Sequence, residues 1–199
     1  KGSKLEKIKD ANQKIYVAVG DSITHGVGQG NATYKTYPYL LSKKLDVDYY
    51  NLAVGGGKIS IPVAKQLKDW KKIDLMTVLI GYNDWCFEGK SPEEYKAKYK
   101  EFLQIVRENH PDTKIHCITL LYTKNDKARR TDHKPAQFRT ALESLVQELQ
   151  KSGDKNLFLI KGNEITSEKN LRADNPKDPV HLGEEGASLF ANELFNLIK

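Results

Sequence analysis

The sequence predicts an α/β protein in which a parallel sheet is covered by helices on both faces. Short runs of apolar, β-branched and aromatic residues alternate along the 199-residue chain with longer segments of helical spacing. Strands that are separated by helices need crossover connections, which favour parallel pairing. The length fits one domain, residues 1–199, and we expect residues 1–13 to be an N-terminal extension of it.

Each expected strand is a short apolar run. The first ends at Gly20, where the backbone must turn sharply, and the strongest is Leu-Met-Thr-Val-Leu-Ile, which Gly81 follows. Because ligands bind outside the carboxyl ends of parallel strands, both glycines mark the edge where a site is expected. The strands are predicted at 15–19, 48–54, 75–80, 114–121 and 157–160.

The expected helices fall between these strands. The clearest start is at Ser91, an N-cap residue, with Pro92 at the first helical position and two glutamates after it, and Pro111 closes this segment. The helices are predicted at 37–45, 61–70, 92–108, 135–149 and 184–198.

Two short motifs at opposite ends of the chain supply the parts of a serine hydrolase. Gly20-Asp21-Ser22-Ile23 follows the first strand, and Asp178-Pro179-Val180-His181 precedes the last helix. A serine hydroxyl needs an imidazole to take its proton and a carboxylate to hold that imidazole in the right tautomer. We predict these roles for Ser22, His181 and Asp178, while Asp174 remains the alternative carboxylate.

Two further motifs follow the second and third strands. They are Asn51-Leu52-Ala53-Val54-Gly55-Gly56-Gly57 and Gly81-Tyr82-Asn83-Asp84. Attack on an ester carbonyl creates an oxyanion, which needs donors such as a side-chain amide and backbone N–H groups exposed by glycine. Asn83 and Gly56 can supply them. Taken singly, the motifs are better explained by the asparagine as a turn cap and the glycines as tight backbone, whereas the motifs together favour the oxyanion role.

These four blocks, in this order, resemble those of the SGNH or GDSL family of hydrolases, named for Ser, Gly, Asn and His in such blocks. The first block has Ile23 in place of the usual leucine, and Asn51 with Gly56 matches the second. The resemblance spans nearly the whole chain. It implies a flavodoxin-like fold, a five-stranded parallel sheet between two helix layers.

The resemblance also implies roles for individual residues. Ser22 would be the nucleophile, His181 the base and Asp178 its orienting carboxylate, while Ser22 N–H, Gly56 N–H and the Asn83 amide would form the oxyanion hole. Gly56 lies five residues after Asn51, as in family members, although the adjacent Gly55 or Gly57 could replace it.

Other residues are candidates for substrate contact. His25 lies three residues after Ser22, and Tyr34, Tyr37 and Trp85 could shape the mouth of the site or simply pack. His110, His116 and His133 are expected to be structural or exposed. We expect neither a metal nor a cofactor.

The expected activity is hydrolysis of carboxylic esters, with removal of a short acyl group, foremost acetyl, from carbohydrate oxygen through an acyl-enzyme. A lysophospholipase or thioesterase and an acyltransferase are the alternatives within the family. A non-catalytic, flavodoxin-like binding domain is the alternative of another class.

Composition excludes several partners. The net charge is +6, but lysines are interleaved with glutamates, and the densest basic run, Lys127-Ala128-Arg129-Arg130, lacks the interleaved aromatic residues of nucleic-acid sites. Gly26-Val27-Gly28-Gln29-Gly30 places Asn31 where a nucleotide loop needs its third glycine. No apolar run approaches the roughly 20 residues of a membrane span. The pattern predicts no binding of nucleic acid or nucleotide and no membrane span, and it leaves the oligomeric state open.

The cysteines and the first residue bear on the compartment. Cys86 and Cys117 lack metal or redox spacing, and a single disulfide between them stays open. Because the chain begins with Lys1 and its one methionine is Met76, we expect a processed product, secreted or in the cell envelope.

Overall fold

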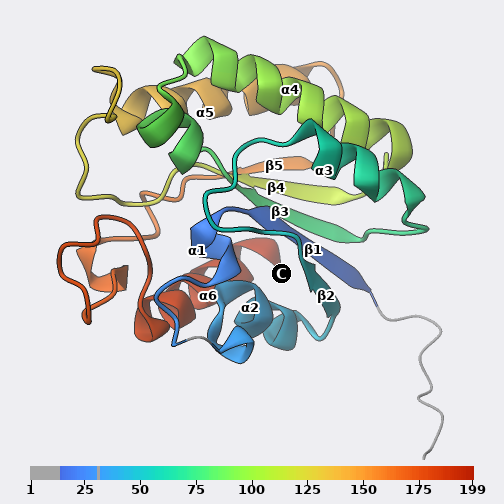
Figure 1. Ribbon diagram of the computed structural model, residues 1–199. Coiled ribbons are helices and arrows are strands. Elements are labelled where there is room, and N and C mark those ends of the chain that lie inside the picture. Colours follow the sequence, from blue (N-terminus) through green and yellow to red (C-terminus); the bar gives the residue numbers. More distant parts are fainter. Residues whose placement is uncertain (1–13, 31) are drawn as a thin grey trace, which may run out of the picture.

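Five parallel strands form one sheet in the order β2-β1-β3-β4-β5 (Figure 1). The computed structural model describes residues 14–30 and 32–199, so the predicted N-terminal extension, residues 1–13, lies outside the described residues. The strands are β1 (Ile15–Gly20), β2 (Asp48–Asn51), β3 (Leu75–Leu79), β4 (Lys114–Ile118) and β5 (Leu157–Ile160). The predicted parallel sheet is confirmed.

Helices cover both faces of the sheet. In Figure 1, α2 and α6 lie together on one face, and α3, α4 and α5 lie on the other, in agreement with their contacts. The helices are α1 (Ser22–His25), α2 (Tyr37–Leu45), α3 (Ile61–Gln66), α4 (Pro92–Asn109), α5 (Pro135–Lys151) and α6 (Glu184–Ile198). This arrangement confirms the predicted three-layer α/β/α fold. Of the described helices, none is long and apolar enough to cross a bilayer.

Sequence signals account for the longest helix, α4. The Ser91 hydroxyl accepts a hydrogen bond from the Glu94 N–H (3.1 Å), and the Glu94 carboxylate accepts one from the Ser91 N–H (2.8 Å). These bonds satisfy two donors that a helix start otherwise leaves unpaired. Tyr95, Tyr99 and Phe102 then recur at helical spacing and are buried against the sheet.

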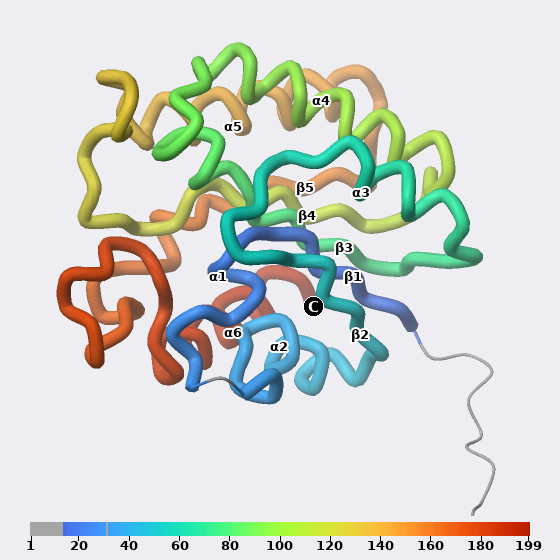
Figure 2. Tube along the Cα trace, in the orientation of Figure 1, coloured from blue at the N-terminus to red at the C-terminus, as the bar shows by residue number. Residues whose placement is uncertain are grey.

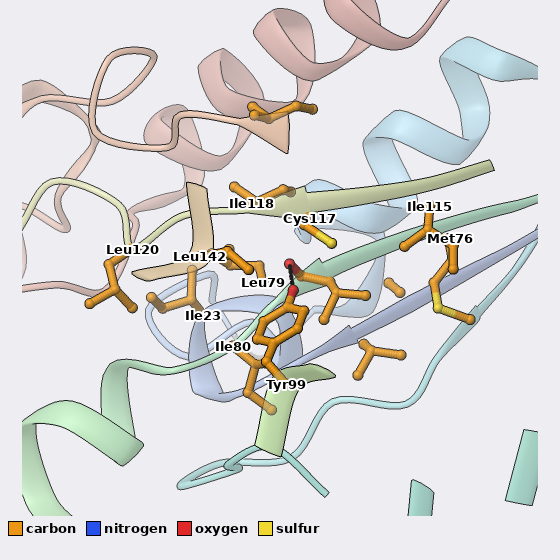
Figure 3. Packing of buried hydrophobic residues seen from close by; sticks show 14 of the residues in the cluster. Ile23, Met76, Leu79, Ile80, Tyr99, Ile115, Cys117, Ile118, Leu120 and Leu142 are labelled. Atoms are coloured by element: carbon orange, nitrogen blue, oxygen red, sulfur yellow. Dashed lines mark hydrogen bonds between the residues drawn. The ribbon is translucent and has the colours of Figure 1, made fainter. Parts of the chain in front are cut away.

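The core lies on both sides of the central strands. All of β3 is buried, as expected for a parallel strand covered on both faces. Figure 3 shows Met76, Ile115 and Cys117 packed among the apolar side chains of this core, with the Tyr99 hydroxyl donating to the Val78 carbonyl at 3.3 Å. Cys86 and Cys117 are both free and buried, so the described structure has no disulfide between them, and burial raises the pKa of Cys117 to about 12.

Two strands end three residues earlier than predicted. β2 ends at Asn51 and β4 at Ile118, whereas the apolar pattern continues to residues 54 and 121. Leu120 and Leu121 are buried without being part of the strand, because the loop itself packs on the core. An apolar run indicates that its residues are buried, but buried residues need not pair in a strand. Likewise α3 ends at Gln66, and a 3₁₀ turn, Leu67–Asp69, continues it.

The sheet brings several loops to one end of the molecule. β1 pairs with β3 in a register that sets Gly20 beside Leu79, so the chain leaves both strands at the same edge. β2 lies on one side of β1 and β3 on the other, which makes this the point where the strand order reverses. Figure 2 shows α1 and the loops that follow β4 and β5 gathered at this end.

Candidate active site

Ser22 begins α1 directly after the central strand β1. A Cβ on Gly20 would lie 2.0 Å from the Thr24 hydroxyl oxygen, so this tight turn requires glycine. Asp21 caps the short helix, because its carboxylate accepts a hydrogen bond from the Ile23 N–H at 3.0 Å. The turn therefore fixes the Ser22 hydroxyl at the carboxyl edge of the sheet.

A closed loop after β5 carries Asp178 and His181. Its two ends are joined by an antiparallel bridge between Leu171 and Leu182, and the Arg172 N–H donates to the His181 carbonyl at 3.0 Å. Within the loop, one oxygen of Asp178 accepts from the N–H groups of Val180 (3.1 Å) and His181 (3.0 Å). The short spacing between aspartate and histidine thus forms a local turn that holds the imidazole.

The three predicted residues form a continuous hydrogen-bonded chain. His181 Nε2 lies 2.8 Å from Ser22 Oγ, and its Nδ1 lies 2.8 Å from Asp178 Oδ2. A carboxylate can only accept, so Nδ1 carries the proton and Nε2 is left as acceptor for the serine hydroxyl. This is the tautomer that general-base chemistry at a serine requires.

Asp178 is held in its ionised form. Burial raises the pKa of its carboxyl, but hydrogen bonds from the N–H groups of His181 and Val180 and from the imidazole outweigh it, and the net effect lowers the pKa. The alternative carboxylate, Asp174, is paired instead with Arg172, whose Nε lies 2.9 Å from it. The structure therefore brings Asp178, and not Asp174, to the imidazole.

The residues predicted to supply the oxyanion donors line one pocket together. Ser22 N–H lies in the first turn of α1, where no acceptor exists within a helix. Gly56 has a φ of 75°, which favours glycine, and its N–H has no partner among the described hydrogen bonds. Gly57 N–H donates to the Val54 carbonyl at 2.9 Å and is thus engaged. Asn83 uses one amide hydrogen on the Gly57 carbonyl (2.9 Å) and keeps the other.

One pocket of about 460 Å³ contains Ser22, Gly56, Asn83, Asp178 and His181 together. Gly55 and Gly57 are not among its lining residues, which favours Gly56 as the backbone donor. No site role was predicted from the sequence for most of the remaining wall. It includes Val27, Tyr82, Phe87, Asn125, Arg129 and Asn175.

The residues expected to contact substrate lie in different environments. The expectation for Trp85 is wrong, because its side chain is fully buried and its indole N–H donates to the His133 carbonyl at 2.8 Å. Tyr37 is also fully buried and lies edge-on to Phe190. His25 and Tyr34 are exposed but are not lining residues of this pocket, and their contact with substrate stays a prediction.

A larger hollow of about 600 Å³ lies at the opposite edge of the sheet, where Lys14, Asp74 and Lys114 flank the starts of the strands. Its lining contains neither serine nor cysteine, and its one histidine, His110, is bonded to the Leu67 carbonyl at 2.7 Å. The nucleophile and its base therefore identify the smaller pocket as the candidate active site.

Comparisons with known proteins agree with this geometry. The model of the GDSL-like Lipase/Acylhydrolase family matches residues 18–189. A protein of Mycoplasma pneumoniae described as uncharacterized is 25% identical over 208 residues, which cover 93% of this chain but 23% of that protein. The chain thus spans about a quarter of that relative's length.

Solved structures share the fold. A salicylyl-acyltransferase from a tetracycline biosynthetic pathway superposes with a TM-score of 0.80 at 24% identity, covering 96% of this chain and 55% of that one. A family two carbohydrate esterase from Clostridium thermocellum, in complex with cellohexaose, gives 0.79 at 16% identity, covering 98% and 66%. A carbohydrate acetylesterase from Sinorhizobium meliloti gives 0.76 at 12% identity, covering 94% and 98%. With a family model matched over most of its length, the chain belongs to the GDSL-like lipase/acylhydrolase family.

Proposed function

We propose that the protein is a serine esterase that removes short acyl groups, foremost acetyl, from the oxygen atoms of carbohydrates. The observation that carries the proposal is the hydrogen-bonded chain from Ser22 through His181 to Asp178. In the first step the serine oxygen attacks the ester carbonyl while Nε2 takes its proton. The ionised Asp178 stabilises the imidazolium that forms.

Three donors then meet the oxyanion of the tetrahedral intermediate. Ser22, Gly56 and Asn83 line the same pocket. We assign their available N–H groups as the donors, since fixed donors stabilise charge as it develops. The imidazolium returns its proton to the departing alcohol, which leaves an acyl-enzyme. A water molecule, activated by the same imidazole, releases the acid and restores the serine.

The size of the pocket supports a short acyl group, and the polar side chains in its wall support a carbohydrate. The pocket is modest, and the polar side chains of Asn125 and Asn175 lie in its wall with the Tyr82 hydroxyl, which accepts from the Asn125 amide at 2.6 Å. Such groups suit the hydroxyls of a sugar better than a long acyl chain. Two of the structural relatives are described as carbohydrate esterases.

An acyltransferase is the second candidate, because one structural relative is described as a salicylyl-acyltransferase. The chemistry differs only in the last step, where an alcohol replaces water. Adding a second alcohol during turnover separates the two, since a transferase yields a new ester and a hydrolase yields free acid.

An organophosphonate tests the nucleophile directly. We expect intact mass to show one adduct on the wild-type protein and none on Ser22→Ala, and peptide mapping to place the adduct on Ser22. Acetylated sugars and nitrophenyl esters of increasing chain length then define the substrate. A protein that forms no adduct, or whose Ser22→Ala variant still turns over esters, would refute the proposal.

A further inference from the structure

The basic run Lys127-Ala128-Arg129-Arg130 lies in the loop between β4 and α5, beside the candidate active site. Ala128 is buried and its N–H donates to the His133 carbonyl at 3.1 Å, while the Arg129 N–H donates to the Cys86 carbonyl at 2.9 Å. Cys86 belongs to the turn that follows Asn83, so these bonds fasten the run to the segment that carries an oxyanion donor. Of the three basic residues, Arg129 alone lines the Ser22 pocket.

The exposed Arg129 side chain lies over an aromatic ring at the pocket wall. Its guanidinium carbon lies 4.5 Å from the centroid of the Phe87 ring, and Phe87 also lines the pocket. Packing on an aromatic face occupies the flat side of a guanidinium and leaves the N–H groups at its edge free. Those edge groups form a fork that matches the two oxygens of a carboxylate or a phosphate.

Among the residues that the structure describes, no carboxylate is paired with this cation. Arg129 takes part in no ion pair within residues 14–30 and 32–199. Of the carboxylates in the described residues, Asp178 alone lines the pocket. Its oxygens are engaged by His181, by two backbone N–H groups and by Arg172, 3.7 Å away. The nearby Glu88 is paired with Lys58 and Lys90. A substrate that enters the pocket therefore meets a free positive charge.

We propose that Arg129 binds an anionic group of the substrate, so that the enzyme prefers esters on acidic molecules, such as acetylated uronic acids or sugar phosphates, over neutral esters. The inference rests on the proposed esterase function and names its substrate class. The carboxylate or phosphate would lie against the guanidinium fork while the ester carbonyl lies at Ser22. A neutral sugar would gain nothing from this contact.

Three aryl acetates that differ only in the para substituent test the preference. The probes are 4-nitrophenyl acetate, which is neutral, 4-acetoxybenzoate, which carries a carboxylate, and 4-acetoxyphenyl phosphate. For Arg129→Gln we expect the ratio of kcat/KM on each anionic ester to kcat/KM on the neutral ester to fall about 5-fold, the upper end for an ion pair at an exposed guanidinium. A larger fall for one of the two anionic esters identifies carboxylate or phosphate as the preferred group.

Arg130→Gln is the matched control, because this neighbouring arginine packs on Gly89 and does not line the pocket. We expect it to keep the wild-type ratios. Ratios that do not change in Arg129→Gln, or that change equally in Arg130→Gln, would overturn the proposal and leave the esterase function standing. A wild-type protein that hydrolyses no ester and forms no phosphonate adduct would instead refute the proposed function, and this inference with it.

Discussion

Replacing Asp178 by asparagine tests how the imidazole is held. Asparagine keeps one oxygen, which can still accept the bonds from Val180 and His181 that now measure 3.1 and 3.0 Å. The loop should therefore keep its shape. The amide nitrogen takes the place of the oxygen that lies 2.8 Å from His181 Nδ1.

The consequence is a change of tautomer. An amide nitrogen donates, so Nδ1 becomes the acceptor at its shorter contact and the proton moves to Nε2, which faces the Ser22 hydroxyl at 2.8 Å. The retained oxygen lies 3.0 Å from Nδ1 but is already shared by two backbone N–H groups. A protonated Nε2 cannot take the serine proton. We expect kcat to fall about 10⁴-fold, as for the same change in other serine triads. This corresponds to a rise of about 5.5 kcal/mol in the activation free energy.

The assay is kcat for hydrolysis of 4-nitrophenyl acetate, with thermal unfolding measured in parallel to verify the fold. Asp174→Asn is the matched control, since that carboxylate is paired with Arg172 and lies outside the chain of hydrogen bonds. If Asp178→Asn kept more than about a tenth of the activity, or if Asp174→Asn lost as much, the tautomer argument would be refuted.

Three other variants probe the donors and the buried charges. Asn83→Ala should lower kcat by about 10²- to 10³-fold through loss of an oxyanion donor. A single-turnover rate constant equal to that of the wild type would contradict this. Burial, together with the charge of Asp84, raises the pKa of Asp21 from 3.8 to about 7. Between these values the folded state holds a proton that the unfolded chain has released, so the free energy of unfolding falls as pH rises, by up to about 1.4 kcal/mol per unit. Asp21→Asn should flatten this slope in urea unfolding between pH 4 and 7, and an unchanged slope would disprove it. Lys90→Met leaves the fully buried Asp84 without the ammonium now 2.6 Å away. Lys90→Met should lower the free energy of unfolding by about 3 to 5 kcal/mol. Lys58→Met should lower it by at most about 1 kcal/mol, because the partner of Lys58, Glu88, is partly exposed. Equal losses in the two variants would exclude the buried pair as the cause.

Much of the fold was predictable because its signals are local. Apolar runs and helical spacing identified all five strands and the main helices, and the cap at Ser91 gave the start of α4. The errors were at strand ends. Apolar character continues past Asn51 and Ile118, since the loops that follow also pack on the core.

The candidate site divides in the same way. Asp178 and His181 are three residues apart, so one turn brings them together, and their contact could be predicted from the spacing alone. Trp85 was misplaced because an aromatic residue next to a catalytic motif has the same pattern whether it faces the pocket or the core. Only the three-dimensional packing distinguishes these cases.

By itself, the sequence determined the class of fold, the nucleophile with its turn, and the pair of residues that would activate it, because each depends on neighbours a few positions away. Tertiary structure decided the rest. It joined Ser22 to an imidazole 159 residues away, favoured one of three consecutive glycines as a donor, and set Arg129 in the wall of the pocket. Those contacts depend on how the sheet aligns the ends of its strands, and no local pattern of residues encodes distances between loops so far apart in the chain.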